Sequence, residues 1–155
     1  MRILMVCLGN ICRSPIAEGV LRHMAQQHKL DWVIDSAGTE SFHVGEAPHK
    51  FSQKICLSHG IDISAQRARK FTTVDFDNYD KIYVMAHDVY REVERIGGKH
   101  AQMNKVDYFL NELHEGQNEN VPDPWYGGEE GFTPVYNLIE KTCKEIIKHY
   151  AHNKA

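Results

Sequence analysis

The feature that most constrains the fold is a short apolar run near the start of the chain that stops directly at a cysteine. Residues 3–6 are continuously apolar, as expected of a central parallel strand that is covered on both faces. Cys7 follows at once, and Ser14-Pro15 then has the pattern of a helix N-cap with proline at the first helical position. The sequence therefore predicts a strand, a tight loop and a helix in immediate succession.

The rest of the chain alternates between the strand and helix patterns. Further strands are predicted at residues 32–34, 81–86 and 106–110, and further helices at residues 48–59 and from an Asp88 cap to residues 97–98. A last helix is predicted by one apolar face: Val135, Leu138, Ile139, Cys143, Ile146, Ile147 and Tyr150. This order predicts an α/β three-layer sandwich, with a four-stranded parallel sheet and helices on both faces.

Composition limits the class of protein. The 155 residues fit one domain over residues 1–155, without repeats or linkers. A net charge of −3 with no dense basic patch argues against nucleic acid or a membrane as partner. No apolar run approaches about 20 residues, and no signal peptide is apparent. We therefore expect a cytoplasmic protein with free thiols. The cysteines are Cys7, Cys12, Cys56 and Cys143.

The loop between Cys7 and Ser14 combines the groups that bind a phosphate. It follows a strand, where parallel α/β folds place their ligands. Successive backbone N–H groups can form an anion-binding concavity, and the next helix adds the positive end of its dipole. Arg13 can donate two parallel hydrogen bonds to phosphate oxygens, and Gly9 and Asn10 tolerate the positive φ that a tight loop needs.

Cys7 is the candidate nucleophile of this loop. A helix N-terminus lowers the pKa of a nearby thiol from about 8.5 into the range of roughly 3.5–7.5, and a thiolate can attack phosphorus in line. Ser14 can hydrogen-bond the thiolate when it departs. The alternative is that Cys7 and Cys12 are small core residues and Arg13 a solvated charge. A metal site is not expected, because no other Cys or His pair has suitable spacing.

A contiguous stretch of thirteen residues resembles the signature of the low-molecular-weight protein tyrosine phosphatases: Val6-Cys7-Leu8-Gly9-Asn10-Ile11-Cys12-Arg13-Ser14-Pro15-Ile16-Ala17-Glu18. Further similarity lies in residues 35–39, in Gly60-Ile61 with Ala68-Arg69, and in Asp123-Pro124-Trp125-Tyr126. The resemblance runs from about residue 2 to residue 150. It implies a flavodoxin-like strand order 2-1-3-4 and hydrolysis of phosphotyrosine and aryl phosphates through a phosphocysteine on Cys7.

The resemblance also implies partners and residue roles. Partners would be phosphotyrosine proteins or peptides, with inorganic phosphate or other oxyanions as inhibitors, no cofactor, and a monomer able to associate weakly as a homodimer. The phosphate-binding loop would be Leu8, Gly9, Asn10, Ile11, Cys12, Arg13 and Ser14, supported by Asn10, Ser14 and Ser36. Cys12 would capture oxidised Cys7 as a disulfide.

Asp123 is the candidate general acid and base. Taken alone, Asp123-Pro124 indicates only a turn, but the family's general acid falls at this aspartate. The residues that would line the substrate pocket are Leu8, Phe42, Trp125 and Tyr126, where aromatic walls favour a flat aromatic substrate.

One position departs from the family pattern. Gln66 stands where the family usually has a histidine that braces the loop. Glutamine can donate and accept hydrogen bonds, so it can keep that brace or leave the loop looser.

Two other functions share parts of this pattern. An arsenate reductase of the same fold would need further cysteines, and residues 75–110 contain none. A non-catalytic phosphotyrosine-binding module would explain the phosphate loop but would leave Asp123 without a role.

Overall fold

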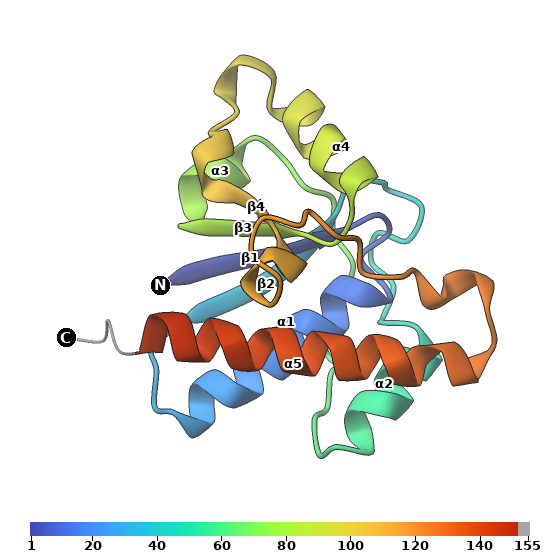
Figure 1. Ribbon diagram of the computed structural model, residues 1–155. Helices are drawn as coiled ribbons and strands as arrows, with labels where there is room; N and C mark the ends of the chain where they lie inside the picture. Colours follow the sequence, from blue (N-terminus) through green and yellow to red (C-terminus); the bar gives the residue numbers. More distant parts are fainter. Residues whose placement is uncertain (152–155) are drawn as a thin grey trace.

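Four parallel strands form the centre of the molecule. The computed structural model describes residues 1–151, apart from the side chain of Tyr126. The strands are β1 (Arg2–Cys7), β2 (Val33–Gly38), β3 (Lys81–Val84) and β4 (Val106–Tyr108), in the order β2-β1-β3-β4. Helices cover both faces of this sheet (Figure 1). The predicted three-layer α/β fold and its strand order 2-1-3-4 are confirmed.

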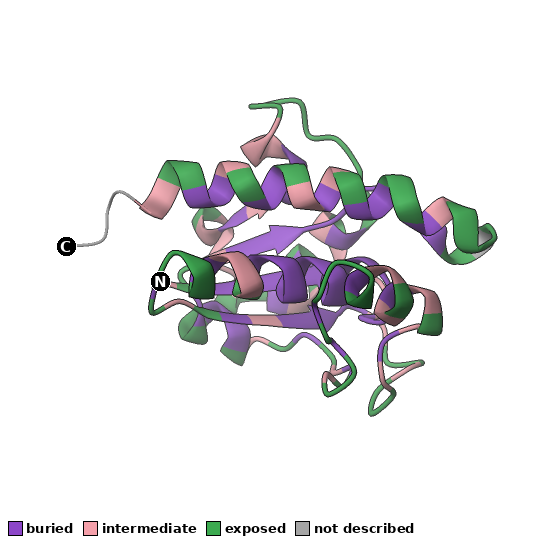
Figure 2. Ribbon diagram, turned by 90° about the horizontal axis from the view of Figure 1, so that it is seen from below, coloured by how far each residue is buried: buried purple, intermediate pink, exposed green. Residues whose placement is uncertain are grey.

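The helices divide between the two faces of the sheet. One face carries α1 (Arg13–Gln27), α2 (Lys50–Leu57) and α5 (Phe132–Tyr150), and the other carries α3 (Val74–Asn78) and α4 (His87–Gly97). Short 3-10 helices complete the connections: η1 (Gly98–His100), η2 (Met103–Lys105), η3 (Phe109–Glu112), η4 (Pro124–Tyr126) and η5 (Glu129–Gly131). Figure 2 shows that buried residues lie on the inward faces of the helices and along the sheet.

Strand β1 is buried on both sides, as its apolar run predicts. Ile3 and Met5 pack with α1 and α5, whereas Leu4 and Val6 pack with α3 and α4. The strand pairs with β2 and with β3, and Cys7 lies opposite Gly38 at its carboxyl end. The central strand of the sheet therefore delivers Cys7 to the edge where parallel sheets bind ligands.

Several predicted boundaries are wrong by a few residues. Strand β2 extends to Gly38, and β4 ends at Tyr108 because the next residues form η3. Helix α2 is shorter than residues 48–59, and the short helix α3 was not predicted. Of the predicted apolar face of α5, Leu138 and Tyr150 are only partly buried.

Two predicted helix caps are also wrong. Helix α1 begins at Arg13 after Cys12, and the Ser14 side chain does not cap it. Helix α4 has Ala86 at its N-cap, so Asp88 lies in its first turn. None of the helices formed by the described residues combines the length and the apolar character of a membrane span.

Candidate active site

The loop after β1 is pinned against the end of β2. Thr39 N–H donates to the Cys7 carbonyl at 3.1 Å, and Glu40 N–H donates to the Leu8 carbonyl at 2.9 Å. A Cβ on Gly38 would lie 2.9 Å from the Leu8 carbonyl oxygen, so the loop approaches more closely than any side chain allows. Asn10 has a φ of 57°, in the left-handed region that its sequence position predicted.

This conformation leaves a series of backbone donors in the loop. Within residues 1–151, the N–H groups of Leu8, Gly9, Ile11 and Cys12 make no hydrogen bond to the protein. All four residues line one cavity together with Arg13. Such an array of N–H groups before a helix N-terminus, with a guanidinium beside it, can bind an oxyanion.

Two hydrogen-bond donors converge on the sulfur of Cys7. Asn10 N–H donates to Sγ at 3.2 Å, and the Ser14 hydroxyl lies 3.0 Å from Sγ. Asn10 Nδ2 donates to Ser14 Oγ at 2.8 Å. When Cys7 is a thiolate it can only accept, so the Ser14 hydroxyl then donates its hydrogen to Sγ. Charge-assisted bonds of this kind stabilise negative charge on the acceptor.

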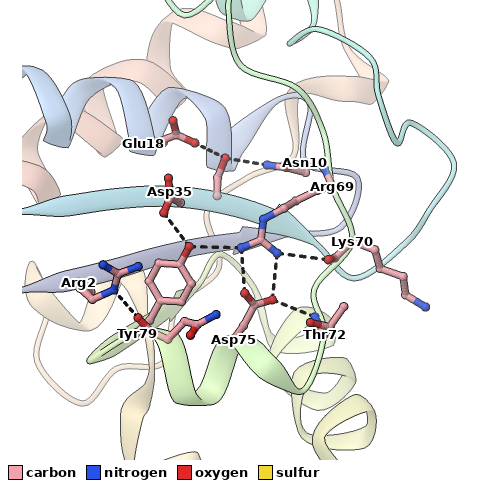
Figure 3. A network of polar contacts seen from close by, with 11 residues as sticks. Arg2, Asn10, Glu18, Asp35, Arg69, Lys70, Thr72, Asp75 and Tyr79 are labelled. Carbon is pink, nitrogen blue, oxygen red and sulfur yellow. Dashed lines mark hydrogen bonds and ion pairs between the residues drawn. The ribbon is translucent and has the colours of Figure 1, made fainter.

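The orientation of the Asn10 amide is set from both ends. Its Oδ1 accepts the Arg69 N–H at 3.1 Å, and its Nδ2 donates to Ser36 Oγ at 2.9 Å. Ser36 in turn donates its hydrogen to Glu18 Oε1 at 2.6 Å (Figure 3). Because the carboxylate accepts that hydrogen, Ser36 must accept from Asn10. One Asn10 amide hydrogen is therefore held by Ser36 and Glu18, and the other points to Ser14 beside Cys7.

Glu18 is a buried carboxyl group at the far end of this chain. Arg22, one helical turn away, forms an ion pair with it at 2.9 Å. Burial raises the pKa of Glu18 above its ordinary value of 4.5, while the Ser36 hydrogen bond and Arg22 oppose that rise. Sequence reasoning found Glu18 only as part of the motif. Its i,i+4 spacing from Arg22 was the one further signal.

Arg69 supports the same region from the opposite side. Its guanidinium makes two hydrogen bonds to Asp75, at 3.0 Å and 2.9 Å, and one to the Tyr79 hydroxyl at 3.4 Å (Figure 3). Tyr79 donates to Asp35 in β2 at 2.6 Å. The segment that holds Asn10 Oδ1 is thus itself fixed to the sheet.

Gln66 does not take part in this network. Its Nε2 donates to the Pro15 carbonyl at 3.1 Å, and its buried Oε1 has no hydrogen-bond partner. Asn10 and Ser36 are instead held by Glu18 and by the Arg69 N–H. The sequence left open whether Gln66 keeps the brace of the phosphate-binding loop or leaves the loop looser. The loop is braced, but by groups other than the Gln66 side chain.

Asp123 lies across the cavity from the loop. Its Oδ1 accepts the Trp125 N–H at 3.0 Å and so caps η4, while Oδ2 lies 3.7 Å from Arg13 Nη2. Arg13 also donates to the Val121 carbonyl at 3.0 Å. The buried guanidinium therefore contacts the segment that leads to Asp123. The Asp123 side chain is 27% exposed and can reach a bound substrate.

The cavity between these groups has a volume of about 210 Å³. Its lining is Cys7, Leu8, Gly9, Ile11, Cys12, Arg13, Glu40, Phe42, His43, Asp123 and Trp125. The structure thus brings the sequence-predicted Leu8, Phe42 and Trp125 to one site, whereas the Tyr126 side chain lies outside the described part of the chain. Sequence reasoning missed Glu40 and His43, which neighbour Phe42 in a segment with no motif.

The cysteines are all buried free thiols. Burial, followed by the nearby Cys7, raises the pKa of Cys12 to about 12. Cys56 and Cys143 belong to the core that packs α1 and α5 on the sheet, and for Cys143 the apolar face of the last helix predicted this. Among residues 1–151, no group of three or more His, Cys, Asp or Glu side chains could hold a metal ion.

Comparisons with known proteins agree with this geometry. Residues 2–155 match the family model described as low molecular weight phosphotyrosine protein phosphatase. A low molecular weight phosphotyrosine protein phosphatase of Schizosaccharomyces pombe is 35% identical over 97% of each chain. The crystal structure of a protein tyrosine phosphatase from Entamoeba histolytica has a TM-score of 0.88 at 35% identity, covering 100% of this chain and 99% of that one. A drosophila arginine phosphatase has a TM-score of 0.89 at 30% identity, covering 97% and 98%.

Proposed function

The chain belongs to the low molecular weight phosphotyrosine protein phosphatase family, and we propose that it hydrolyses phosphotyrosine and aryl phosphates through a phosphocysteine on Cys7. One observation carries the proposal. Cys7, Arg13 and Asp123 line the same cavity, with hydrogen-bond donors already directed at the sulfur. A non-catalytic binding module would need the anion loop but not Asp123.

The first step transfers the phosphoryl group to Cys7. Arg13 and the N–H groups of the loop hold the phosphate oxygens, and the thiolate forms the S–P bond as the P–O bond to tyrosine breaks. Asp123 gives its proton to the departing phenolate oxygen. The Trp125 N–H holds Oδ1, which leaves Oδ2 to carry that proton.

The second step releases phosphate. The Asp123 carboxylate accepts a proton from water, whose oxygen bonds to phosphorus as the S–P bond breaks. The departing thiolate regains its hydrogen bonds from Ser14 and from Asn10 N–H. Bound inorganic phosphate or another oxyanion would occupy the same donors and inhibit the enzyme.

The walls of the cavity support an aromatic substrate. Leu8, Ile11, Phe42 and Trp125 line the cavity, and contacts of a phenyl ring with aromatic side chains contribute about 0.5–1.5 kcal/mol beyond burial. Phosphoarginine is a second candidate, because the carboxylates of Glu40 and Asp123 line the same cavity and can bind a guanidinium. A solved relative carries the name arginine phosphatase.

Turnover of three substrates tests the proposal: p-nitrophenyl phosphate, a phosphotyrosine peptide and a phosphoarginine peptide. We expect Cys7→Ser to bind phosphate without turnover. Asp123→Ala should lose about 10²–10⁴-fold in kcat/KM on phosphotyrosine, and less on p-nitrophenyl phosphate because nitrophenolate leaves more easily. Normal turnover by Cys7→Ser would sink the mechanism. Faster turnover of phosphoarginine by the wild type would reassign the substrate.

Cys12 is proposed as the redox partner of Cys7. Hydrogen peroxide would convert the Cys7 thiol to a sulfenic acid and water, and Cys12 would displace a second water to form a disulfide. Both thiols line one cavity. A thiol reductant should restore peroxide-treated wild type but not Cys12→Ser. Equal recovery of the two would exclude this role.

A further inference from the structure

His49 joins the catalytic loop to the start of α2. Its backbone N–H donates to the Ile11 carbonyl at 2.8 Å, and its ring Nδ1 accepts the Phe51 N–H at 3.1 Å as the N-cap of α2. Because Nδ1 accepts a hydrogen bond, the ring is neutral, with its hydrogen on Nε2. Burial of the ring, with Lys50 beside it, lowers the pKa of His49 below 6.5, which favours the same neutral form.

The imidazole ring of His49 contacts aromatic rings from three segments. It lies edge-on to Trp125, with centroids 5.5 Å apart and an interplanar angle of 80°. It also stacks on Phe132 at the start of α5, at 5.2 Å and 26°, and lies 5.2 Å from Phe51. One side chain thus connects α2, α5 and the segment that carries Asp123.

The segment around Asp123 needs such a support. The described contacts of the Asp123 carboxylate are its bond from the Trp125 N–H and the 3.7 Å approach of Arg13. Trp125 is 46% exposed, and its ring is held by His49 on one side and by His43 at 5.5 Å on another. Because the Trp125 N–H holds Asp123 Oδ1, moving the tryptophan also moves the carboxylate.

We propose that His49 is a positioning residue that fixes Trp125, and through it Asp123, above the catalytic loop to which its own backbone is bonded. This inference rests on the proposed role of Asp123 as general acid. Replacing His49 should therefore slow only the turnover of substrates whose leaving group needs protonation. A displacement of about 1 Å at a catalytic group can cost up to 10²-fold in rate.

Two substitutions separate the ring of His49 from its capping bond. His49→Asn keeps an excellent N-cap and removes the ring, whereas His49→Phe keeps a ring and removes the acceptor. His59→Asn is the matched control, because the ring of His59 also stacks on an aromatic ring, but on Tyr136 at 4.1 Å and not on Trp125. The readout is kcat/KM for a phosphotyrosine peptide divided by kcat/KM for p-nitrophenyl phosphate.

We expect the ratio to fall about tenfold in His49→Asn, a fraction of the effect of a whole general acid. In His49→Phe the ratio should stay near the wild-type value while Tm falls by about 2–4 °C, as expected for the loss of one cap. His59→Asn should leave the ratio unchanged. An unchanged ratio in His49→Asn, or an equal loss on both substrates, would overturn the inference.

Fluorescence gives a readout that does not depend on turnover. Trp32 and Trp125 are the two tryptophans of the chain, so a Trp32→Phe background reports Trp125 alone. His49→Asn should increase acrylamide quenching of Trp125, and unchanged quenching would overturn the contact on which the inference rests. If the wild type did not hydrolyse phosphotyrosine while the quenching result held, the proposed function would fail and the ring contact would stand.

Discussion

The two sides of the cavity are built in different ways. On the loop side, the side chains of Asn10, Ser36 and Glu18 are buried and joined to one another and to Ser14 by hydrogen bonds of 2.6–2.9 Å. The Ser14 hydroxyl lies 3.0 Å from the sulfur of Cys7. On the acid side, Asp123 is partly exposed, and the rings of Trp125 and its neighbours supply most of the contacts.

This difference matches what the proposed mechanism requires of each side. Charge on sulfur and phosphate is stabilised best by donors that are fixed before the substrate arrives, because they need no reorganisation during the reaction. In that mechanism the acid side must admit a bulky substrate and release its phenol, and segments of this kind come from the less stable parts of a fold. Ring contacts hold a position without the strict directions of hydrogen bonds.

The largest expected effect comes from breaking the loop side at Asn10. Asn10→Ala removes the bonds to Ser14, Ser36 and the Arg69 N–H and leaves a residue with a Cβ at a φ of 57°. We expect kcat/KM to fall about 10²-fold, equally for a phosphotyrosine peptide and for p-nitrophenyl phosphate.

Asn10→Gly is the control for backbone strain. It loses the same hydrogen bonds as Asn10→Ala. Its free energy of unfolding should be about 1 kcal/mol higher than that of Asn10→Ala, because glycine adopts positive φ freely. A selective loss on phosphotyrosine in either variant would contradict the division between the two sides.

A smaller effect is expected from Glu18, and it depends on pH. The raised pKa means that folded protein binds more protons than unfolded protein between pH 4.5 and the folded pKa. The wild type should therefore lose stability relative to Glu18→Gln as the pH rises through that window. Tm measurements of both proteins across that pH range check the sign. If the Tm of the wild type rose relative to that of Glu18→Gln with increasing pH, the effect of Arg22 on the pKa of Glu18 would outweigh that of burial.

The smallest effect is expected from the ion pair that ties α2 to η5. Lys54 and Glu129 lie 2.6 Å apart, but their side chains are 68% and 48% exposed, and such pairs contribute about 0–1 kcal/mol. Lys54→Ala should leave the ratio of the two kcat/KM values within about twofold of the wild type. A tenfold change would mean that this ion pair, and not the aromatic contacts, holds the acid side.

Local patterns in the sequence predicted the fold well. The apolar run at residues 3–6 and the spacing of α5 identify a buried strand and an amphipathic helix without further information. The boundaries of the elements were predicted less accurately. Phe109 and Leu110 are apolar and buried, as expected of strand residues, but they belong to η3 and not to a longer β4.

Prediction of the site stopped where partners lie far apart along the chain. Cys7 and Arg13 share one motif, but the contact of Ser36 with Glu18 depends on how α1 packs against β2. The Ser14 hydroxyl lies against Cys7, as its expected role toward the thiolate requires, but it does not cap α1 as the Ser14-Pro15 pattern predicted. His49 gave no signal because its ring partners come from three separate segments.

The central position of β1 has a consequence for partial unfolding. Its amides are paired on both sides and its residues 3–6 are fully buried, so they should exchange with deuterium only when the whole domain opens. The Trp125 segment is partly exposed and held mainly by ring contacts, so we expect it to open at a lower free energy than the whole domain. As denaturant is added, activity on phosphotyrosine should therefore decline before activity on p-nitrophenyl phosphate. The ratio of activity on phosphotyrosine to activity on p-nitrophenyl phosphate would then report the local stability of the Trp125 segment.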